Sequence, residues 1–212
     1  DVNKLSKRTV GMSPADLRNL INTAAIHAVK CNQSITNEAD IDYAYDRILM
    51  GIKSSNKGFG FTEKDIRAVA IHEVGHTLAA LWNEHAMDVH KVTVLSVGGS
   101  LGSTSLVPKI ESQNSTKKTV IAQLDVALGG RVAEEVYLGA DKITTGCSDD
   151  MSKATKIAYD YFASYGLDDG SLLAFEDLKK LDEDTKHNVE KQVNSLLFER
   201  YSIVKDQFMR NR

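Results

Sequence analysis

Residues 62–82 read TEKDIRAVAIHEVGHTLAALW and predict a single helix. Thr62 is a favourable N-cap residue, and the apolar side chains from Ile66 to Leu81 recur at the spacing of one helix face. The same periodicity returns in residues 119–138, 149–165 and 185–209. Only two prolines interrupt the 212 residues, so the sequence predicts a mostly α-helical protein.

The segment before this helix carries two more helix signals. Ser13 followed by Pro14 predicts an N-cap with proline in the first turn, and apolar residues then recur at helical spacing. A second amphipathic helix is expected to begin after Thr36 or Asn37 and to end at Gly51, because glycine is favoured just past a helix C-terminus. We therefore expect a short helical segment at the N-terminal side of the chain.

A small β element is expected after the 62–82 helix. Residues 89–97 are rich in valine and precede two glycines, a pattern that predicts a strand followed by a turn. Residues 101–107 predict a second, edge-type strand that Pro108 ends.

The polar, glycine-containing run at residues 53–60, KSSNKGFG, predicts a linker. It would join the helical segment 1–52 to a larger domain, 61–212. The chain starts at Asp1 rather than at a methionine, and we expect it to be a fragment of a longer protein.

Composition and charge exclude several classes of protein. Apolar residues make up 42% and charged residues 26% of the chain, which is typical of a globular protein. The net charge of −3 argues against nucleic acid as a partner. No apolar run approaches the roughly 20 residues of a membrane-spanning helix. The two cysteines, Cys31 and Cys147, are expected to be reduced thiols.

His72-Glu73-Val74-Gly75-His76 matches the pattern H-E-x-x-H. Side chains four positions apart on a helix are rotated by only about 40°, so both imidazoles can bind one metal ion. Glu73 is rotated by about 100° from His72, which leaves it free to accept a proton from a metal-bound water. The arrangement indicates a zinc hydrolase. The alternative is a chance match on an ordinary amphipathic helix.

A catalytic zinc ion needs a third protein ligand. Ala79 and Trp82 stand where the extended pattern H-E-x-x-H-x-x-G-x-x-H has glycine and histidine, which excludes that ligand set. His85 and His90 follow the motif too closely to return readily to the same helix face, so carboxylates are favoured. The residues alone leave open which other donor binds: Glu134, Glu135, Cys147, Asp149 or Asp150.

The chain resembles the FtsH-type AAA metalloproteases over about residues 5–166. That family consists of membrane-anchored, hexameric, ATP-dependent zinc proteases and includes the AAA proteases of the mitochondrial inner membrane. The segments that carry the resemblance occur in the family's order: Ser13–Leu17, Asp46–Gly51, His72–His76, Leu128–Glu135 and Thr144–Asp150.

The resemblance implies a helical zinc-peptidase domain at 61–212, preceded by the end of an AAA lid at 1–52. It implies that Zn²⁺ is held by three residues and that Glu73 activates the bound water; the ligands are His72, His76 and Asp150. The predicted strands could align an unfolded substrate through its backbone.

Glu134 is expected to support one of the two imidazoles rather than to bind the metal. The alternative is that Arg131 pairs with Glu134 and Glu135 along one helix.

The resemblance also implies properties of a full-length protein. It would degrade unfolded or misassembled proteins as a hexamer, held in the membrane by a segment outside this chain. The location would be the mitochondrial inner membrane or another organelle membrane in a eukaryote, and the inner membrane in a bacterium. The phosphate-binding pattern G-x-x-x-x-G-K-[ST] is absent, so ATP and Mg²⁺ are expected to bind only in the full-length protein. The alternatives are a catalytically inactive oligomerisation module of the same family and a zinc aminopeptidase or esterase.

Overall fold

A computed structural model describes residues 2–49, 62–94, 102–109, 114–168, 174 and 182–211. The predicted linker at 53–60 and residues 95–97 of the first predicted strand lie outside the described residues. Contacts within the chain divide it into two compact units, Asp1–Thr62 with Val94–Ser103, and Glu63–Thr93 with Thr104–Arg212. The H-E-x-x-H motif belongs to the second unit.

The first unit contains three helices: α1 (Val2–Arg8), α2 (Pro14–Lys30) and α3 (Glu38–Leu49). Ser13 caps α2 as predicted, because its side chain accepts the Asp16 N–H while the Asp16 carboxylate accepts the Ser13 N–H. Helices α2 and α3 pack together around four buried side chains, Leu20, Ala24, Ala44 and Tyr45. The sequence patterns did not predict α1.

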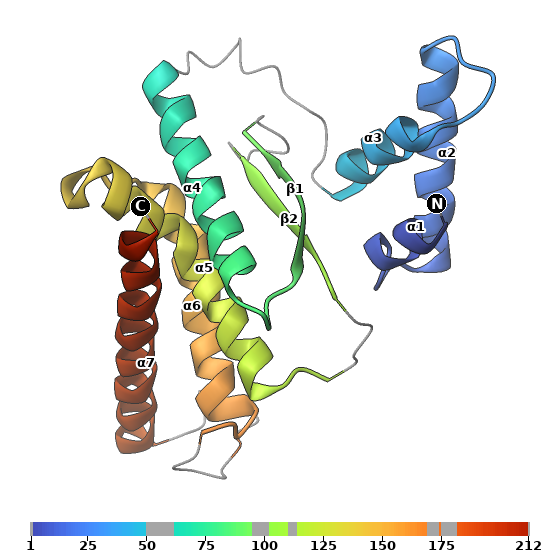
Figure 1. Cartoon of the computed structure of the whole chain (residues 1–212). Coiled ribbons are helices and arrows are strands. Elements are labelled where there is room, and N and C mark those ends of the chain that lie inside the picture. Colours follow the sequence, from blue (N-terminus) through green and yellow to red (C-terminus); the bar gives the residue numbers. More distant parts are fainter. Residues whose placement is uncertain are drawn as a thin grey trace. The chain divides into compact units, whose positions relative to one another are not determined.

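The second unit holds the remaining helices and a small sheet (Figure 1). Its elements are α4 (Glu63–Trp82), β1 (Asp88–Thr93), β2 (Ser103–Val107, all but its first residue), α5 (Lys117–Leu138), α6 (Ser148–Tyr159) and α7 (Glu183–Arg210). Helix α5 contacts α4, α6 and α7, and β1, which pairs with β2, packs against α4. The predicted mostly α fold with one small β element is confirmed.

Helices α4 and α5 cross at two glycines. A Cβ built on Gly75 would lie 2.5 Å from the Gly129 carbonyl oxygen, and one built on Gly129 would lie 2.7 Å from the Gly75 carbonyl oxygen. Because neither position has room for a methyl group, the two backbones approach far more closely than side chains would allow. The motif helix is thus held directly against α5.

Helix α7 is fixed to α5 by a buried ion pair. Arg200 donates two hydrogen bonds to the Asp125 carboxylate, at 2.8 and 2.6 Å, and Asn83 donates a third at 3.1 Å. Asp125 is 4% exposed. A buried carboxylate is tolerated when its oxygens are paired in this way, so the pair keeps α7 in register with α5.

Most predicted elements begin and end within a few residues of the observed ones. The predicted helix 149–165 is shorter in the structure, since α6 ends at Tyr159 and a π-helical turn, η4 (Asp160–Ser164), follows it. The first strand starts one residue before the predicted 89–97 and ends at Thr93. Two short 3-10 turns that precede α6 were not predicted: η2 (Ala140–Lys142) and η3 (Thr145–Cys147).

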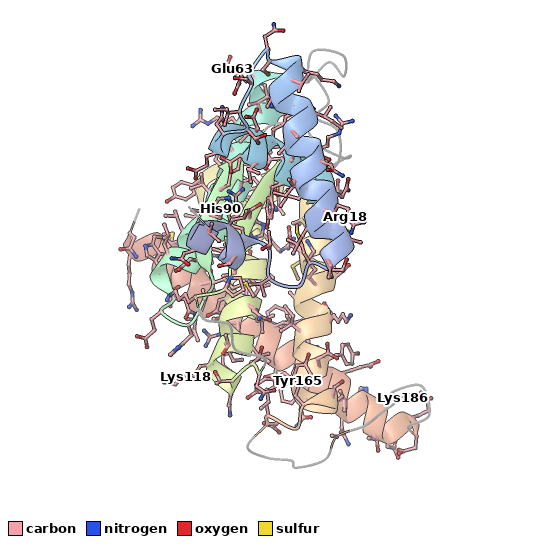
Figure 2. The ribbon with its side chains drawn as sticks, turned by 90° about the vertical axis from the view of Figure 1, so that its right-hand side faces the viewer. Arg18, Glu63, His90, Lys118, Tyr165 and Lys186 are labelled. Atoms are coloured by element: carbon pink, nitrogen blue, oxygen red, sulfur yellow. The ribbon has the colours of Figure 1, made fainter. Side chains whose placement is uncertain are left out.

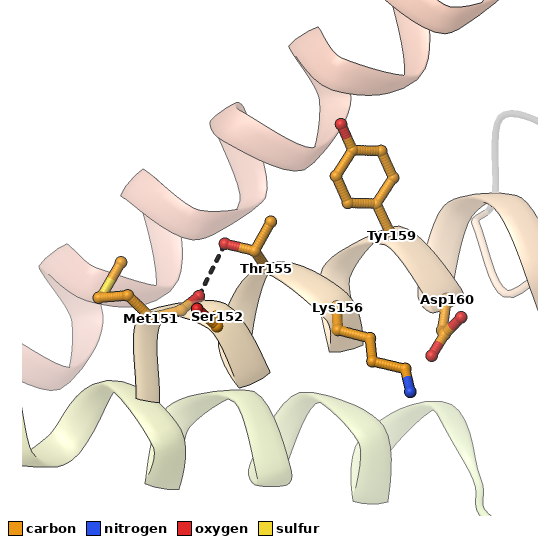
Figure 3. Close-up of a pocket in the computed structure, with 6 residues that line it drawn as sticks. All are labelled: Met151, Ser152, Thr155, Lys156, Tyr159 and Asp160. Carbon is orange, nitrogen blue, oxygen red and sulfur yellow. Dashed lines mark hydrogen bonds between the residues drawn. The ribbon is translucent and has the colours of Figure 1, made fainter. Parts of the chain in front are cut away.

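The outer faces of the helices carry charged side chains that point into solvent, such as Arg18 on α2 and Lys118 on α5 (Figure 2). None of the helices in the described ranges combines the length and the apolar character that a bilayer crossing requires. A surface hollow follows α6 (Figure 3) and includes none of the predicted site residues; it is lined by Met151, Ser152, Thr155, Lys156, Tyr159 and Asp160.

Candidate metal centre

The two motif histidines share one face of α4 and their rings meet edge to face. Nε2 of His72 lies 3.0 Å from Nε2 of His76, and the ring centroids are 4.7 Å apart. This is the arrangement that helical i, i+4 spacing predicts. Both imidazoles are largely buried, with side-chain exposures of 12% and 11%.

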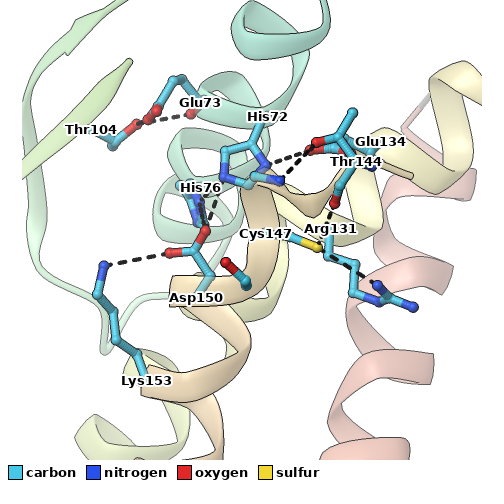
Figure 4. A network of polar contacts seen from close by, with 12 residues as sticks. His72, Glu73, His76, Thr104, Arg131, Glu134, Thr144, Cys147, Asp150 and Lys153 are labelled. Atoms are coloured by element: carbon cyan, nitrogen blue, oxygen red, sulfur yellow. Dashed lines mark hydrogen bonds and ion pairs between the residues drawn. The ribbon is translucent and has the colours of Figure 1, made fainter. Parts of the chain in front are cut away.

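Asp150 joins the two imidazoles from the first turn of α6 (Figure 4). Its Oδ2 lies 3.0 Å from His72 Nε2 and 3.4 Å from His76 Nε2. A tetrahedral zinc ion with ligand atoms about 2.0–2.1 Å away would hold those atoms about 3.3 Å from one another. The three donor atoms therefore already lie at nearly the mutual distances that zinc requires.

The other nitrogen of each ring is bound within the protein. Nδ1 of His76 donates to the Val126 carbonyl oxygen at 2.7 Å, and Nδ1 of His72 lies 2.7 Å from Glu134 Oε1. Because both partners are acceptors, each Nδ1 is assigned a proton, which leaves Nε2 of each ring as the atom that faces Asp150 and could bind a metal ion. Without a metal ion, a proton on His72 Nε2 can lie between this ring and the Asp150 carboxylate, and a bound cation would take the place of that proton. The donor set thus fits a divalent metal ion.

Glu134 is fixed in turn by the loop that leads to α6. The Thr144 N–H donates to Glu134 Oε2 at 2.6 Å, and the Thr144 hydroxyl donates to Oε1 at 3.2 Å. Glu134 is 1% exposed, so its negative charge is balanced by these donors and by His72. The same residues therefore orient the His72 imidazole and connect α5 to the segment that carries Asp150.

The acid–base properties of the cluster without metal follow from these contacts. Burial opposes protonation of His72, yet its hydrogen bonds to Asp150 and Glu134 outweigh burial and raise its pKa to about 10. Burial favours the neutral acid at Asp150, but its bonds to His72 and His76 hold its pKa well below the usual range. Burial likewise favours the neutral acid at Glu134, but hydrogen bonds from His72 and Thr144 outweigh burial and lower its pKa. The site thus holds its carboxylates ionised and concentrates negative charge around the imidazoles.

Gly130 provides the space in which the two imidazoles meet. A Cβ at this position would lie 2.6 Å from His76 Nε2 and 2.7 Å from His72 Nε2. The two glycines of α5 therefore have different tasks: Gly129 allows the helices to touch, whereas Gly130 leaves room for the two imidazole rings.

Glu73 lies beside the cluster and contacts β2 instead of the imidazoles (Figure 4). It is 7% exposed, and the Thr104 hydroxyl lies 2.7 Å from its Oε2. Glu73 does not belong to the group of donor atoms that converge within 4.8 Å, which consists of His72, His76 and Asp150 among the described residues.

The other donors considered from the sequence lie elsewhere in the structure. Glu135 binds Lys205 at 2.8 Å and the Tyr201 hydroxyl, and Asp149 is exposed. Cys147 is buried and donates to the Thr144 carbonyl oxygen, while His85 pairs with Glu84.

Arg131 was considered as a charge partner of Glu134 and Glu135. Together with hydrogen bonds from Lys205 and Tyr201, its charge lowers the pKa of Glu135, but no ion pair with Glu134 forms. The Arg131 guanidinium lies 3.7 Å from Cys147 Sγ and 6.0 Å from the centre of the Tyr201 ring. Glu134 points instead towards α4 and binds His72. The two side chains leave α5 in different directions because Glu134 belongs to the face that α4 buries.

Sequence reasoning missed three contributors to this site. The Val126 carbonyl has no sequence signal, because any residue could supply it. Thr104 lies in an ordinary strand pattern, and Gly130 resembles a second packing glycine. Each acts through a contact between elements that are distant in sequence.

A mostly helical unit whose H-E-x-x-H helix brings two imidazoles to a carboxylate from another helix has the architecture of a helical metallopeptidase. Residues 60–212 match peptidase family M41, and residues 1–43 match the AAA+ lid domain. The chain belongs to peptidase family M41. The resemblance to FtsH-type AAA metalloproteases is thereby confirmed.

Curated relatives carry the name ATP-dependent zinc metalloprotease. YME1L1 of Mus musculus is 35% identical over 202 residues, which cover 95% of this chain and 28% of that protein. FTSH 11, chloroplastic/mitochondrial, of Arabidopsis thaliana is 34% identical over 211 residues, 100% of this chain and 26% of that protein. FtsH of Acidobacterium capsulatum is 35% identical over 167 residues, 79% of this chain and 26% of that protein. The chain therefore spans less than a third of the length of these relatives.

Proposed function

We propose that residues 61–212 form a zinc-dependent endopeptidase domain. The observation that carries the proposal is the convergence of three donor atoms, from His72, His76 and Asp150, at spacings close to those around a tetrahedral zinc ion. Membership of family M41 and the names of the relatives support the same metal and the same class of reaction.

Each residue of the site has a separate task. When bound, zinc would polarise the substrate carbonyl and make a water molecule more acidic. His72, His76 and Asp150 would hold the ion, and Glu134 would keep His72 turned towards it. Glu73 would accept the proton of the attacking water and pass it to the leaving amine.

The proposed substrate is an unfolded polypeptide. The sheet consists of β1 and β2 alone among the described residues, so each strand has one edge without a strand partner in that part of the chain. An extended peptide can pair with such an edge through backbone hydrogen bonds, which read no side chain. This mode would give low sequence specificity, as protein quality control requires.

The larger assembly is also a proposal. We place 1–52 at the end of an AAA lid, 53–60 in a linker and 61–212 in the peptidase domain. ATP with Mg²⁺ would act in the full-length protein, a hexamer anchored by a membrane segment outside this chain. The location would be the mitochondrial inner membrane or another organelle membrane in a eukaryote, or the inner membrane in a bacterium; one relative is named chloroplastic/mitochondrial and another comes from a bacterium.

One experiment distinguishes this function from its alternatives. The 212-residue chain is loaded with zinc, its metal content is measured, and it is incubated with casein as an unfolded substrate. Cleavage that a chelator abolishes and zinc restores supports the proposal, whereas a chain that binds no zinc and cleaves nothing is the inactive oligomerisation module. Peptides blocked at both ends separate an endopeptidase from an aminopeptidase, and added ATP should leave the rate unchanged.

Glu73→Gln tests the assignment of the base. We expect this variant to keep stoichiometric zinc and to lose about 10²- to 10⁴-fold in rate, the usual contribution of a positioned base. Loss of zinc from the variant would show that Glu73 is a ligand.

A further inference from the structure

The Thr104 side chain connects β2 to the residue proposed as the general base. Its Oγ1 lies 2.7 Å from Glu73 Oε2 and 3.0 Å from the Glu73 carbonyl oxygen (Figure 4). A hydroxyl has a single proton, so it can make a full hydrogen bond to only one of these two oxygens.

The carboxylate is the better acceptor for that proton. The Glu73 carbonyl already receives the Thr77 hydroxyl at 2.9 Å, and within α4 it also accepts the N–H four residues further on. Its two lone pairs are therefore occupied without Thr104. Oε2 is closer and negatively charged, and hydrogen bonds to ionised acceptors are the stronger ones. Thr104 thus donates to the Glu73 carboxylate.

Thr104 is well suited to hold a carboxylate in one place. It lies inside β2, whose backbone is paired with β1, and its β-branched side chain has restricted χ1 freedom. A glutamate side chain otherwise has several rotatable bonds and loses conformational entropy when it is held in one rotamer. The rigid partner therefore reduces the freedom of the flexible one.

The two carboxylate oxygens of Glu73 have different environments. Oε2 accepts the Thr104 bond, whereas Oε1 accepts no hydrogen bond from the described part of the chain. Among the described residues, the side-chain nitrogen or oxygen that is both fully buried and without a hydrogen bond is Arg8 Nε. Glu73 Oε1 also lacks a hydrogen bond from these residues, so it is not fully buried and keeps some access to solvent. One oxygen is thus held and the other is free to meet a water molecule.

We propose that Thr104 is a positioning residue for Glu73: its hydroxyl holds Oε2 so that Oε1 receives the proton of the attacking water. This inference rests on the proposed function, because it assigns Glu73 the role of base. Since Thr104 belongs to a strand proposed to pair with substrate, the element that aligns the peptide also orients the base. Thr104 itself touches neither substrate nor metal in this scheme.

The test compares substitutions of two threonines that both contact Glu73. Thr104→Val removes the hydroxyl and keeps the β-branched shape, while Thr104→Ser keeps the hydroxyl. Thr77→Val is the matched control, because it removes a hydroxyl that binds the Glu73 backbone and not its carboxylate. Zinc content, thermal stability, kcat and KM are measured for each zinc-loaded 212-residue chain, with an internally quenched peptide blocked at both ends.

We expect Thr104→Val to bind zinc as the wild type does and to have an unchanged KM. Its kcat should fall roughly 10- to 100-fold, which corresponds to the free energy of one hydrogen bond to a charged group. Thr104→Ser should recover most of that loss, and Thr77→Val should keep kcat within about twofold. In a Glu73→Gln background, Thr104→Val should lower the residual rate no further, because a residue that acts through the carboxylate has nothing left to position.

Other outcomes overturn the inference in distinguishable ways. An active wild type whose kcat is unchanged by Thr104→Val rules out the positioning role and leaves the proposed function intact. The same follows if Thr104→Val lowers the residual rate of Glu73→Gln as much as it lowers that of the wild type, or if its defect lies in zinc content or KM. A wild type without zinc-dependent cleavage overturns the proposed function and this inference with it.

Discussion

Replacing Gly130 by alanine is expected to disable the metal site while the fold survives. A Cβ at this position would lie 2.6 Å from His76 Nε2 and 2.6 Å from His72 Cε1. Ordinary van der Waals contact begins at 3.4 Å, so the rings would have to move by about 0.8 Å to admit the methyl group. Both are the ends of side chains, which can swing away without moving the backbone.

The displacement is large on the scale of metal coordination. Ligand distances in a working site vary by only about 0.2 Å, so a shift of this size removes two of three donors from zinc. Mutation of a residue that only orients a metal ligand typically lowers metal affinity by roughly 10- to 100-fold. We expect the zinc affinity of Gly130→Ala to fall by more than this, because the ligand rings themselves move. Alanine is favoured over glycine inside a helix by about 1 kcal/mol, which offsets part of the loss of the imidazole hydrogen bonds, so the Tm of the metal-free variant should fall less than that of Gly129→Ala.

The measurement is a zinc titration in competition with a fluorescent chelator, with circular dichroism melting of the metal-free proteins. Gly129→Ala is the matched control, because its Cβ would meet the Gly75 carbonyl oxygen at 2.7 Å and the Ala79 Cβ at 2.9 Å. Helix backbone cannot swing aside as a side chain can, so Gly129→Ala should lower the Tm. Wild-type zinc affinity in Gly130→Ala would refute the reasoning, and so would a loss of stability equal to that of Gly129→Ala.

Three further results are expected. Asp150→Ala should release most of the zinc, whereas Glu134→Ala should weaken binding by roughly 10- to 100-fold; a chelator titration that ranks them in the opposite order would reverse the two roles. Zinc affinity should rise by up to about tenfold per pH unit from pH 6.5 towards 9, because metal-free His72, with its pKa raised from 6.5 to about 10, holds a proton that zinc must displace. In the metal-free protein, the contribution of protonated His72 to the free energy of unfolding is complete below pH 6.5 and declines as the pH rises towards 10. Affinity independent of pH, with no proton release on binding, would contradict this. Arg200→Met should lower the free energy of unfolding by about 3 kcal/mol, since Asp125 is left buried without its cation, and should unfold at lower urea; Arg210→Met, in the last turn of α7, is the surface control.

The helices and the H-E-x-x-H pair could be predicted because they depend on neighbours in sequence. The apolar spacing of residues 62–82 specifies a helix, and helix geometry alone places His72 and His76 on one face. The cap of α2 at Ser13 is equally local, since all of its hydrogen bonds lie within one turn. In such cases a few bond angles and side-chain lengths determine the outcome.

The third donor depended on tertiary structure. Asp150 lies 78 residues from His72, and Glu134 lies 62 residues from it, yet both reach the same imidazole. Their spacing did not distinguish a ligand from a supporting carboxylate. In the structure α6 brings Asp150 to Nε2 of His72 and α5 brings Glu134 to Nδ1, an arrangement that periodicity does not show; the family resemblance is what favours Asp150 as the proposed ligand.

The sequence by itself determined the long helices and that two imidazoles share a face, because those properties are set by backbone geometry over a few residues. Tertiary structure alone decided that Gly130 faces the imidazoles while Gly129 touches Gly75, and that Thr104 meets the Glu73 carboxylate. Adjacent glycines look alike in a sequence, and a threonine in a strand shows no partner. What distinguishes them is the close approach of α4 to α5 and to β2, which arises from packing of whole elements and is not encoded in any short pattern.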